Sequence, residues 1–273
     1  MDKFIKSEQK INLNHEFYNN KSNIIYKNES QNEKEVFNEI IIELEIYNNE
    51  NEKEINILCD KNQVIKDNEK RREKKENINF PKEFNYFNKN NTKLYLNDKE
   101  IEFNYKLKLN KIGTHKIKIK SNINLISLSS MFYNCKNIIN IKFIKINTNN
   151  VTDMSWMFSD CENISELNLS SFNIEKVKNM SQMFYYCKKL SKLDLSSFNT
   201  INVTNMIEMF SCCFSLSELN LSSFNTNNVI DMSSMFSNCR NLCKLDLSSF
   251  NTINVKDMSS MFSCCFKLSE LIL

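Results

Sequence analysis

Apolar positions recur at one fixed spacing through the second half of the chain. The motif Met-Phe-x-x-Cys occurs six times, and its cysteines are 26 residues apart, at Cys135, Cys161, Cys187, Cys213, Cys239 and Cys265. A constant period between about 20 and 50 residues is typical of repeat proteins, in which each unit buries its apolar face only against its neighbours. The pattern therefore predicts a solenoid of about six coils over residues 121–273.

Each 26-residue unit contains two apolar patterns. In one unit, Leu242-x-x-Leu245-x-Leu247 ends in alternation, which predicts a short strand with Leu245 and Leu247 facing the core. The next segment, Asp257 to Phe262, has apolar residues at i, i+3 and i+4 after a capping-type Asp, which predicts a short helical turn. A short strand plus a helical turn in each coil is the leucine-rich-repeat type of solenoid.

The turn between strand and return arm contains an Asn that recurs once in each unit. The column consists of Asn147, Asn173, Asn199, Asn225 and Asn251. Asn side chains bond the backbone groups that a turn leaves unpaired. We interpret the column as hydrogen bonding rather than ligand binding.

Alternating segments upstream predict a small β-rich domain over residues 36–120, which caps the N-terminal end of the solenoid. Residues 1–35 are polar and carry no structural pattern, and residues 61–79 form a charged linker or solvated helix. Hairpin loops are expected at 48–53 and at 97–99. The expected strands are 40–46, 54–59, 93–96, 100–103, 105–109 and 115–119.

Composition argues against catalysis and cofactors. The chain has one Gly, Gly113, which rules out a glycine-rich phosphate loop, and no Ser, His and Asp arrangement appears. Ten cysteines occur without a C-x-x-C pair, and the two histidines, His15 and His115, are distant from the cysteine column. We expect buried reduced thiols, no metal, no cofactor and no enzyme. A net charge of +3 does not favour a nucleic-acid partner.

The repeat Asn-Val-x-Asp-Met-Ser-x-Met-Phe-x-x-Cys-x-x-Leu-x-x-Leu-x-Leu-Ser-x-Phe-Asn-Thr resembles that of BspA-like leucine-rich-repeat surface proteins. The likeness covers residues 128–273. It implies a surface protein that binds a partner in adhesion or host contact. The chain as written has neither an apolar signal segment nor a run of 18 apolar residues, which predicts a cytoplasmic location and no membrane span.

The candidate interaction surface is the outward strand position, together with Trp156, which is expected to be exposed. Charge alternates in sign along this position, so neighbouring coils are expected to pair. We expect a non-enzymatic scaffold that binds a protein or glycan; the alternative is a structural element that self-assembles through its C-terminal coil. The outward residues are Glu166, Lys192, Glu218, Lys244 and Glu270.

Overall fold

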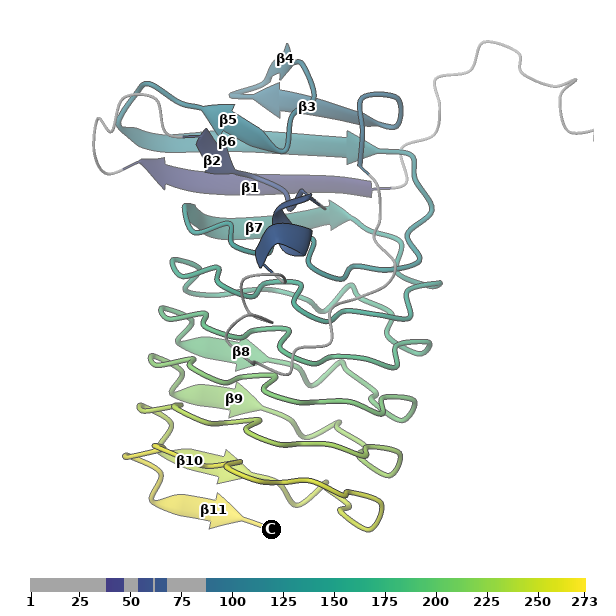
Figure 1. Cartoon of the computed structure of the whole chain (residues 1–273), viewed down its shortest axis with the longest axis vertical. Coiled ribbons are helices and arrows are strands. Elements are labelled where there is room, and N and C mark those ends of the chain that lie inside the picture. Colours follow the sequence, from purple (N-terminus) through teal and green to yellow (C-terminus); the bar gives the residue numbers. More distant parts are fainter. Residues whose placement is uncertain (1–37, 47–53, 61, 68–86) are drawn as a thin grey trace, which may run out of the picture. The chain divides into compact units, whose positions relative to one another are not determined.

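The chain is mainly β-structure in a computed structural model, which describes residues 38–46, 54–60, 62–67 and 87–273. A five-stranded antiparallel sheet with the order β4-β3-β6-β1-β7 lies at one end of the repeats (Figure 1). Strands β2 and β5 pair separately. The strands are β1 (Asn38–Ile46), β2 (Glu54–Asn56), β3 (Thr92–Leu96), β4 (Lys99–Ile101), β5 (Lys106–Lys108), β6 (Gly113–Ser121) and β7 (Ile138–Lys145).

Alternation along the long strands sets the two faces of this sheet. In β1 the apolar side chains of Ile40, Ile42 and Leu44 are fully buried, and the residues between them are half-buried. β6 pairs with β1 over all nine residues and places Ile117 opposite Ile42. The strands expected from alternation at 40–46, 105–109 and 115–119 are therefore confirmed, with shifted ends.

Of the two expected hairpins, one forms. β3 and β4 pair antiparallel, and Asn97 and Asp98 between them have φ of 49° and 66°, as a tight hairpin turn requires. The expected hairpin around 48–53 was wrong, because β1 pairs with β6 and β7 while β2 pairs with β5. The nine-residue β6 pairs with β1 along its whole length, whereas β2 has three residues that could pair with it.

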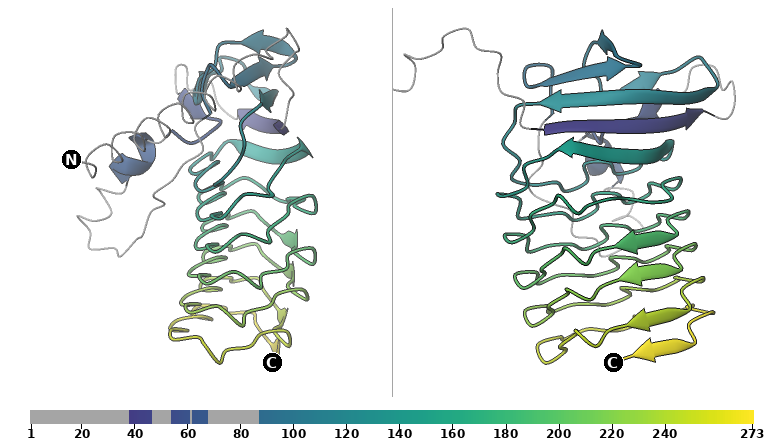
Figure 2. Two further views of the ribbon diagram at one scale, coloured as in Figure 1. Left: turned by 90° about the vertical axis from the view of Figure 1, so that its right-hand side faces the viewer. Right: turned by 180° about the vertical axis from the view of Figure 1, so that it is seen from behind.

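Downstream of β7, the 26-residue units lie on one another in sequence order (Figures 1 and 2). Parallel bridges connect residues 26 apart, from Ser127–Asp153 through to Asp231–Asp257. Short strands lie at equivalent positions of the later units, and β8 pairs with β9 while β10 pairs with β11. These strands are β8 (Lys192–Asp194), β9 (Glu218–Asn220), β10 (Lys244–Asp246) and β11 (Glu270–Ile272).

The predicted fold class, a leucine-rich-repeat solenoid with a helical turn in each coil, was wrong. The structure is mostly β-sheet, and no residue in 87–273 is helical. In the return arm at 128–135, the amide of Met131 bonds Leu128 O in the same unit, whereas the amide of Phe132 bonds Met157 O in the next. Ser130 has a φ of 57°. Because alternate amides bond the neighbouring unit and the backbone enters the left-handed region, a helical ladder cannot form.

Consecutive units are bonded differently at the return arms, here called the arm side, and at the strands, here called the strand side. The buried rings of Phe158, Phe184, Phe210 and Phe236 stack almost parallel, with neighbouring centroids 5.6 Å apart. The rings of Phe224 and Phe250, just after β9 and β10, are 6.2 Å apart. Paired strands need a spacing of about 4.8 Å. Every arm bonds the next, but the strands pair only within β8–β9 and β10–β11.

Two side-chain columns connect consecutive units. Cys161 donates its thiol hydrogen to Phe132 O of the preceding unit at 3.1 Å, and later units repeat the contact. Burial raises the pKa of Cys187 and the other buried thiols of this column. The hydrogen bonding expected of the Asn column is confirmed, since Asn173 Oδ1 accepts a hydrogen bond from the amide of Glu175 and other members make the equivalent bond.

Candidate functional site

The strand side is interrupted next to the five-stranded sheet. β7 is an edge strand of that sheet, and its residues 140–142 are equivalent in the repeat to residues 166–168. Residues 166–168 are not in a strand, whereas the equivalent residues of every later unit are. In the part of the chain that the structure describes, no backbone hydrogen bond joins β7 to residues 166–171.

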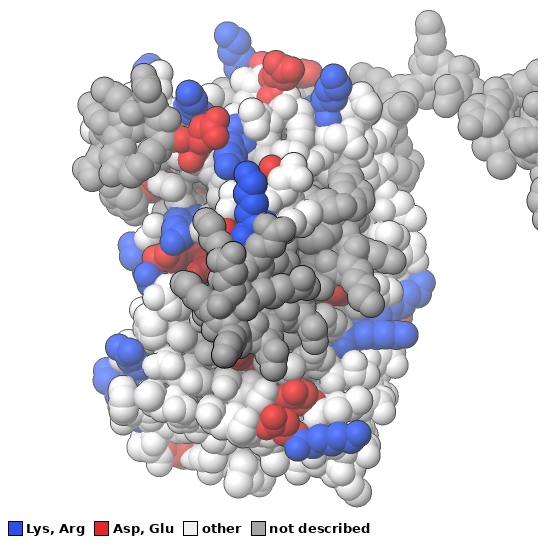
Figure 3. Space-filling view, viewed as in Figure 1, with Lys and Arg blue, Asp and Glu red and all other residues white. Residues whose placement is uncertain are grey.

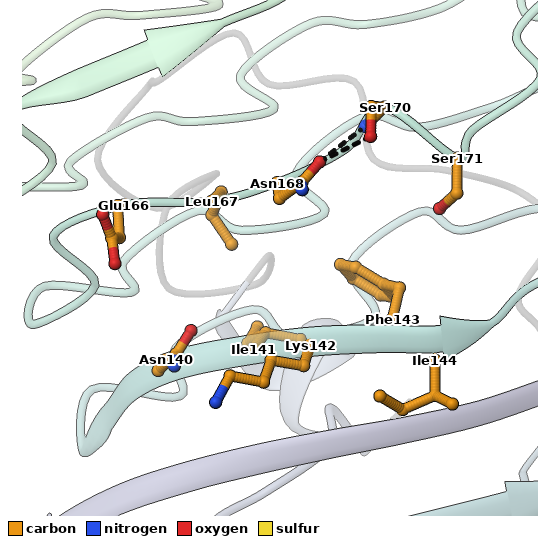
Figure 4. Close-up of a pocket in the computed structure, with 10 residues that line it drawn as sticks. All are labelled: Asn140, Ile141, Lys142, Phe143, Ile144, Glu166, Leu167, Asn168, Ser170 and Ser171. Carbon is orange, nitrogen blue, oxygen red and sulfur yellow. Dashed lines mark hydrogen bonds between the residues drawn. The ribbon is translucent and has the colours of Figure 1, made fainter.

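A cavity of about 530 Å³, here called the β7 groove, occupies this interruption (Figure 4). Its floor is apolar, because Ile141 and Leu167 are buried side chains, and the ring of Phe143 packs edge-on against Phe172 with centroids 4.8 Å apart. Figure 4 shows Phe143 and Leu167 extending into the space between β7 and the segment 166–171. The lining consists of Asn140, Ile141, Lys142, Phe143, Ile144, Glu166, Leu167, Asn168, Ser170 and Ser171.

The rim of the groove is polar and carries both signs of charge. Glu43 accepts a hydrogen bond from Asn140 Nδ2 at 3.0 Å and pairs with Lys142 Nζ at 3.3 Å. The Asn140 bond, together with Lys142, lowers the pKa of the Glu43 carboxyl. Glu166 on the opposite rim is exposed and has no ion pair with any described residue. The rim thus presents one compensated cation and one uncompensated carboxylate.

A side-chain turn fixes the far end of the groove. Asn168 Oδ1 accepts hydrogen bonds from the amide of Ser170 at 3.0 Å and from its hydroxyl at 2.7 Å. An Asn that bonds the backbone two residues on holds the chain in a turn. Segment 166–171 is therefore held by its own contacts, without a strand partner.

The predicted charged residues are all exposed, and the structure brings some of them together in pairs. Lys192 contacts Glu218 at 2.6 Å and Lys244 contacts Glu270 at 2.5 Å. No such pair joins β9 to β10 among the described residues, because those two strands are not hydrogen-bonded. A second, more open cavity of about 530 Å³ lies there, against Lys192, Glu218 and Lys244.

The expected exposure of Trp156 was wrong. Trp156 is fully buried, on the arm side, with Tyr133 packed edge-on at 6.0 Å and Tyr185 at 6.2 Å. Val64, from the helical residues 62–67, packs into the same cluster. Because these upstream residues cover the arm side, Trp156 is a core residue there and not a surface anchor.

Sequence reasoning missed the residues of the β7 groove. The first unit carries Phe143, Ile144, Lys145 and Ile146 where later units carry Leu-Ser-Ser-Phe. Such a departure is typical of a terminal repeat. It also marks the unit whose strand joins another sheet, which was the available signal for the groove.

Charges of both signs are interspersed over the face seen in Figure 3, and the described residues there form no patch of a single sign. Over the described ranges, no helix has the length and apolar character needed to cross a membrane. The same residues contain no group of three His, Cys, Asp or Glu side chains placed to hold a metal ion.

Stacked 26-residue units joined to an antiparallel sheet through a shared strand define a repeat protein of mainly β-structure. A family model described as "Mycoplasma protein of unknown function, DUF285" matches residues 102–218 and 189–272, together more than half of the chain, and the chain belongs to this family. This match corrects the assignment to the BspA-like leucine-rich-repeat family. No curated protein and no solved structure matches the chain.

Proposed function

We propose that the protein is a non-enzymatic binding scaffold that holds a protein or glycan partner on its strand side. The observation that carries the proposal is the β7 groove, a cavity of about 530 Å³ between a sheet edge and a segment without a strand partner. An apolar floor with a polar rim is the usual composition of a binding site.

The frame around the groove supports this proposal. Backbone bonds connect the arm sides of consecutive units at each step, and β7 is held by β1 along its other edge. A site held by such a frame loses little conformational freedom on binding, which favours affinity.

Screening the full chain against a displayed peptide library and a glycan array tests the proposal. Ser171→Arg places a long charged side chain at the groove, and Ser197→Arg places it at the equivalent exposed position of the next unit, outside the groove lining. We expect Ser171→Arg to weaken binding at least about tenfold, as loss of a central contact does, and Ser197→Arg to leave it unchanged. Absence of any ligand, or equal effects of the two variants, would contradict the proposal.

Self-assembly is a second candidate, favoured by the apolar surface of the last unit. Ile253, Phe266 and Leu273 are 81%, 75% and 86% exposed. Large exposed apolar side chains in one region mark interaction surfaces. Light scattering over a concentration series should show growth in mass that Phe266→Asp reduces, and a constant monomer mass would contradict this candidate.

A further inference from the structure

We infer that the β7 groove binds an extended polypeptide segment of a partner protein, which adds as a strand to the free edge of β7. This inference rests on the proposed function and names the partner class for the same site.

The edge of β7 that faces the groove has the regular backbone geometry that a further strand needs for pairing. Residues 140–143 pair regularly with residues 40–43 of β1, between two register shifts, and the same four residues line the groove. An edge strand presents unpaired N–H and C=O groups to any extended chain that reaches it. Strand addition to such an edge is a recurring mode of peptide recognition.

The segment 166–168, which forms the wall of the groove opposite β7, can pair with the same added peptide strand, here called the guest. Segment 166–168 pairs with no strand in the part of the chain that the structure describes, whereas the equivalent segments of the later units are paired strands. A guest strand between β7 and this segment would continue the order of strands from the five-stranded sheet into the repeats. Neither glycan nor helix offers backbone donors and acceptors at strand spacing to both walls.

Side chains define the composition of the guest. Successive residues of a strand point to opposite faces, so alternate guest residues would meet the floor formed by Ile141 and Leu167. The residues between them would lie beside Glu166, whose carboxylate pairs with no cation among the described residues, and near Lys142, whose charge Glu43 already compensates. The expected guest alternates apolar residues with Lys or Arg.

The test uses the full chain and a displayed library of eight-residue peptides that alternate Val, Ile, Leu or Phe with Lys or Arg, against a library of the same composition in scrambled order. An enriched peptide is then synthesised in two forms, unmodified and N-methylated at alternate amides. N-methylation keeps the side chains but removes backbone donors. We expect enrichment of the alternating library and at least about tenfold weaker binding of the N-methylated form, from the loss of two or more hydrogen bonds.

Two charge variants locate the site. Glu166→Lys should weaken binding of the unmodified peptide about three- to fivefold, whereas Glu218→Lys, the same strand position two units on, should change it less than about twofold. Hydrogen exchange should show new protection of residues 140–143 when the peptide binds.

Several outcomes would overturn strand addition. One is that the alternating library is enriched no more than the scrambled library. Another is that the N-methylated peptide binds as tightly as the unmodified one. A third is that Glu166→Lys and Glu218→Lys change binding equally. Growth of the free chain into dimers that protect residues 140–143 would assign the groove to a second copy and also overturn it. A glycan or compact peptide whose binding Ser171→Arg abolishes would refute strand addition alone, whereas no ligand in any library would refute the scaffold as well.

Discussion

The two sides of the repeat are built from the same 26-residue period but are bonded differently. On the arm side, the amides of Phe132, Phe158, Phe184, Phe210 and their equivalents bond the next unit at every step. On the strand side, the only pairs of neighbouring units whose strands pair within residues 87–273 are β8–β9 and β10–β11. At the unpaired step from β9 to β10, the rings of Phe224 and Phe250 are 6.2 Å apart. The arm side is thus a continuous frame, and the strand side keeps unused backbone groups.

This difference separates stability from recognition along the same chain. Units held on one side by their backbones tolerate gaps on the other, and cavities of about 530 Å³ lie against β7 and between β9 and β10. Changes in the arm-side core should therefore affect unfolding strongly, while changes on the strand side should affect it weakly and affect binding instead.

The largest effect is expected from Phe210→Ala. Phe210 is fully buried, and its ring stacks on Phe184 and Phe236 at 5.6 Å. Removing a buried aromatic ring costs about 3 to 5 kcal/mol, because contacts are lost and a cavity remains. Urea unfolding followed by circular dichroism measures the change.

Leu219→Ala is the matched strand-side control. Leu219 is half-buried in β9, next to the unpaired step to β10, and we expect it to cost less than about 2 kcal/mol. Equal losses for Phe210→Ala and Leu219→Ala would mean that both sides hold the stack equally.

A smaller effect is expected at the corner between the two sides. Thr226 Oγ1 donates to Asn251 O at 2.9 Å and accepts from the Asn251 amide at 2.7 Å. Thr226→Val keeps the shape but removes both bonds, so it should lower the free energy of unfolding by about 2 kcal/mol. Ile174 holds the equivalent position in another unit, and Ile174→Thr should cost less than about 1 kcal/mol because two new bonds offset lost apolar burial. Similar costs for the two substitutions in urea unfolding would contradict this explanation.

A pH-dependent effect is expected at Glu162, which contacts Lys136 at 2.7 Å and Lys188 at 2.6 Å, one from each neighbouring unit. Burial raises the pKa of Glu162, but the bonds from the two lysines outweigh burial and leave the pKa below its ordinary value. A carboxyl with a lowered pKa stabilises the fold above the unfolded pKa, and this stabilisation is lost as pH falls through the folded pKa.

Glu162→Gln should therefore destabilise the protein by about 0.5 to 1 kcal/mol at pH 7, after allowance for solvent screening, and by less at pH 3. Thermal unfolding at both pH values checks the difference. An equal loss at pH 3 would assign the effect of Glu162 to packing rather than to charge.

Sequence predicted the local elements better than their assembly. Alternation at 40–46 and 115–119 located β1 and β6, and the 26-residue period located the bridges from Ser127–Asp153 onward. The apolar spacing of the return arm also suits a series of tight turns, because i and i+3 face alike in both. The sequence could not show that alternate amides bond the next unit.

The groove and the burial of Trp156 depend on contacts distant in sequence. The groove exists because β7 joins β1, almost 100 residues upstream, instead of pairing with residues 166–168. Trp156 is buried because Val64 and Tyr133 cover it. Neither contact has a counterpart in the repeat pattern, so counting periods could not reveal them.

The smallest effect is expected from the charge pair on the strand side. Lys192 and Glu218 are 2.6 Å apart, but both side chains are about two-thirds exposed, at 66% and 64%. Water and salt screen such a pair, and ordering two long side chains opposes it. Lys192→Glu should lower Tm by less than about 2 °C, and adding Glu218→Lys should restore the value because the pair re-forms with its signs exchanged. A larger shift that persists in the double variant would show that Lys192 holds β8 against β9 by packing of its aliphatic stem. The strand side would then contribute to the frame at this step, and the contrast with the arm side would hold only at the three unpaired steps, which are β7 to 166–168, 166–168 to β8, and β9 to β10.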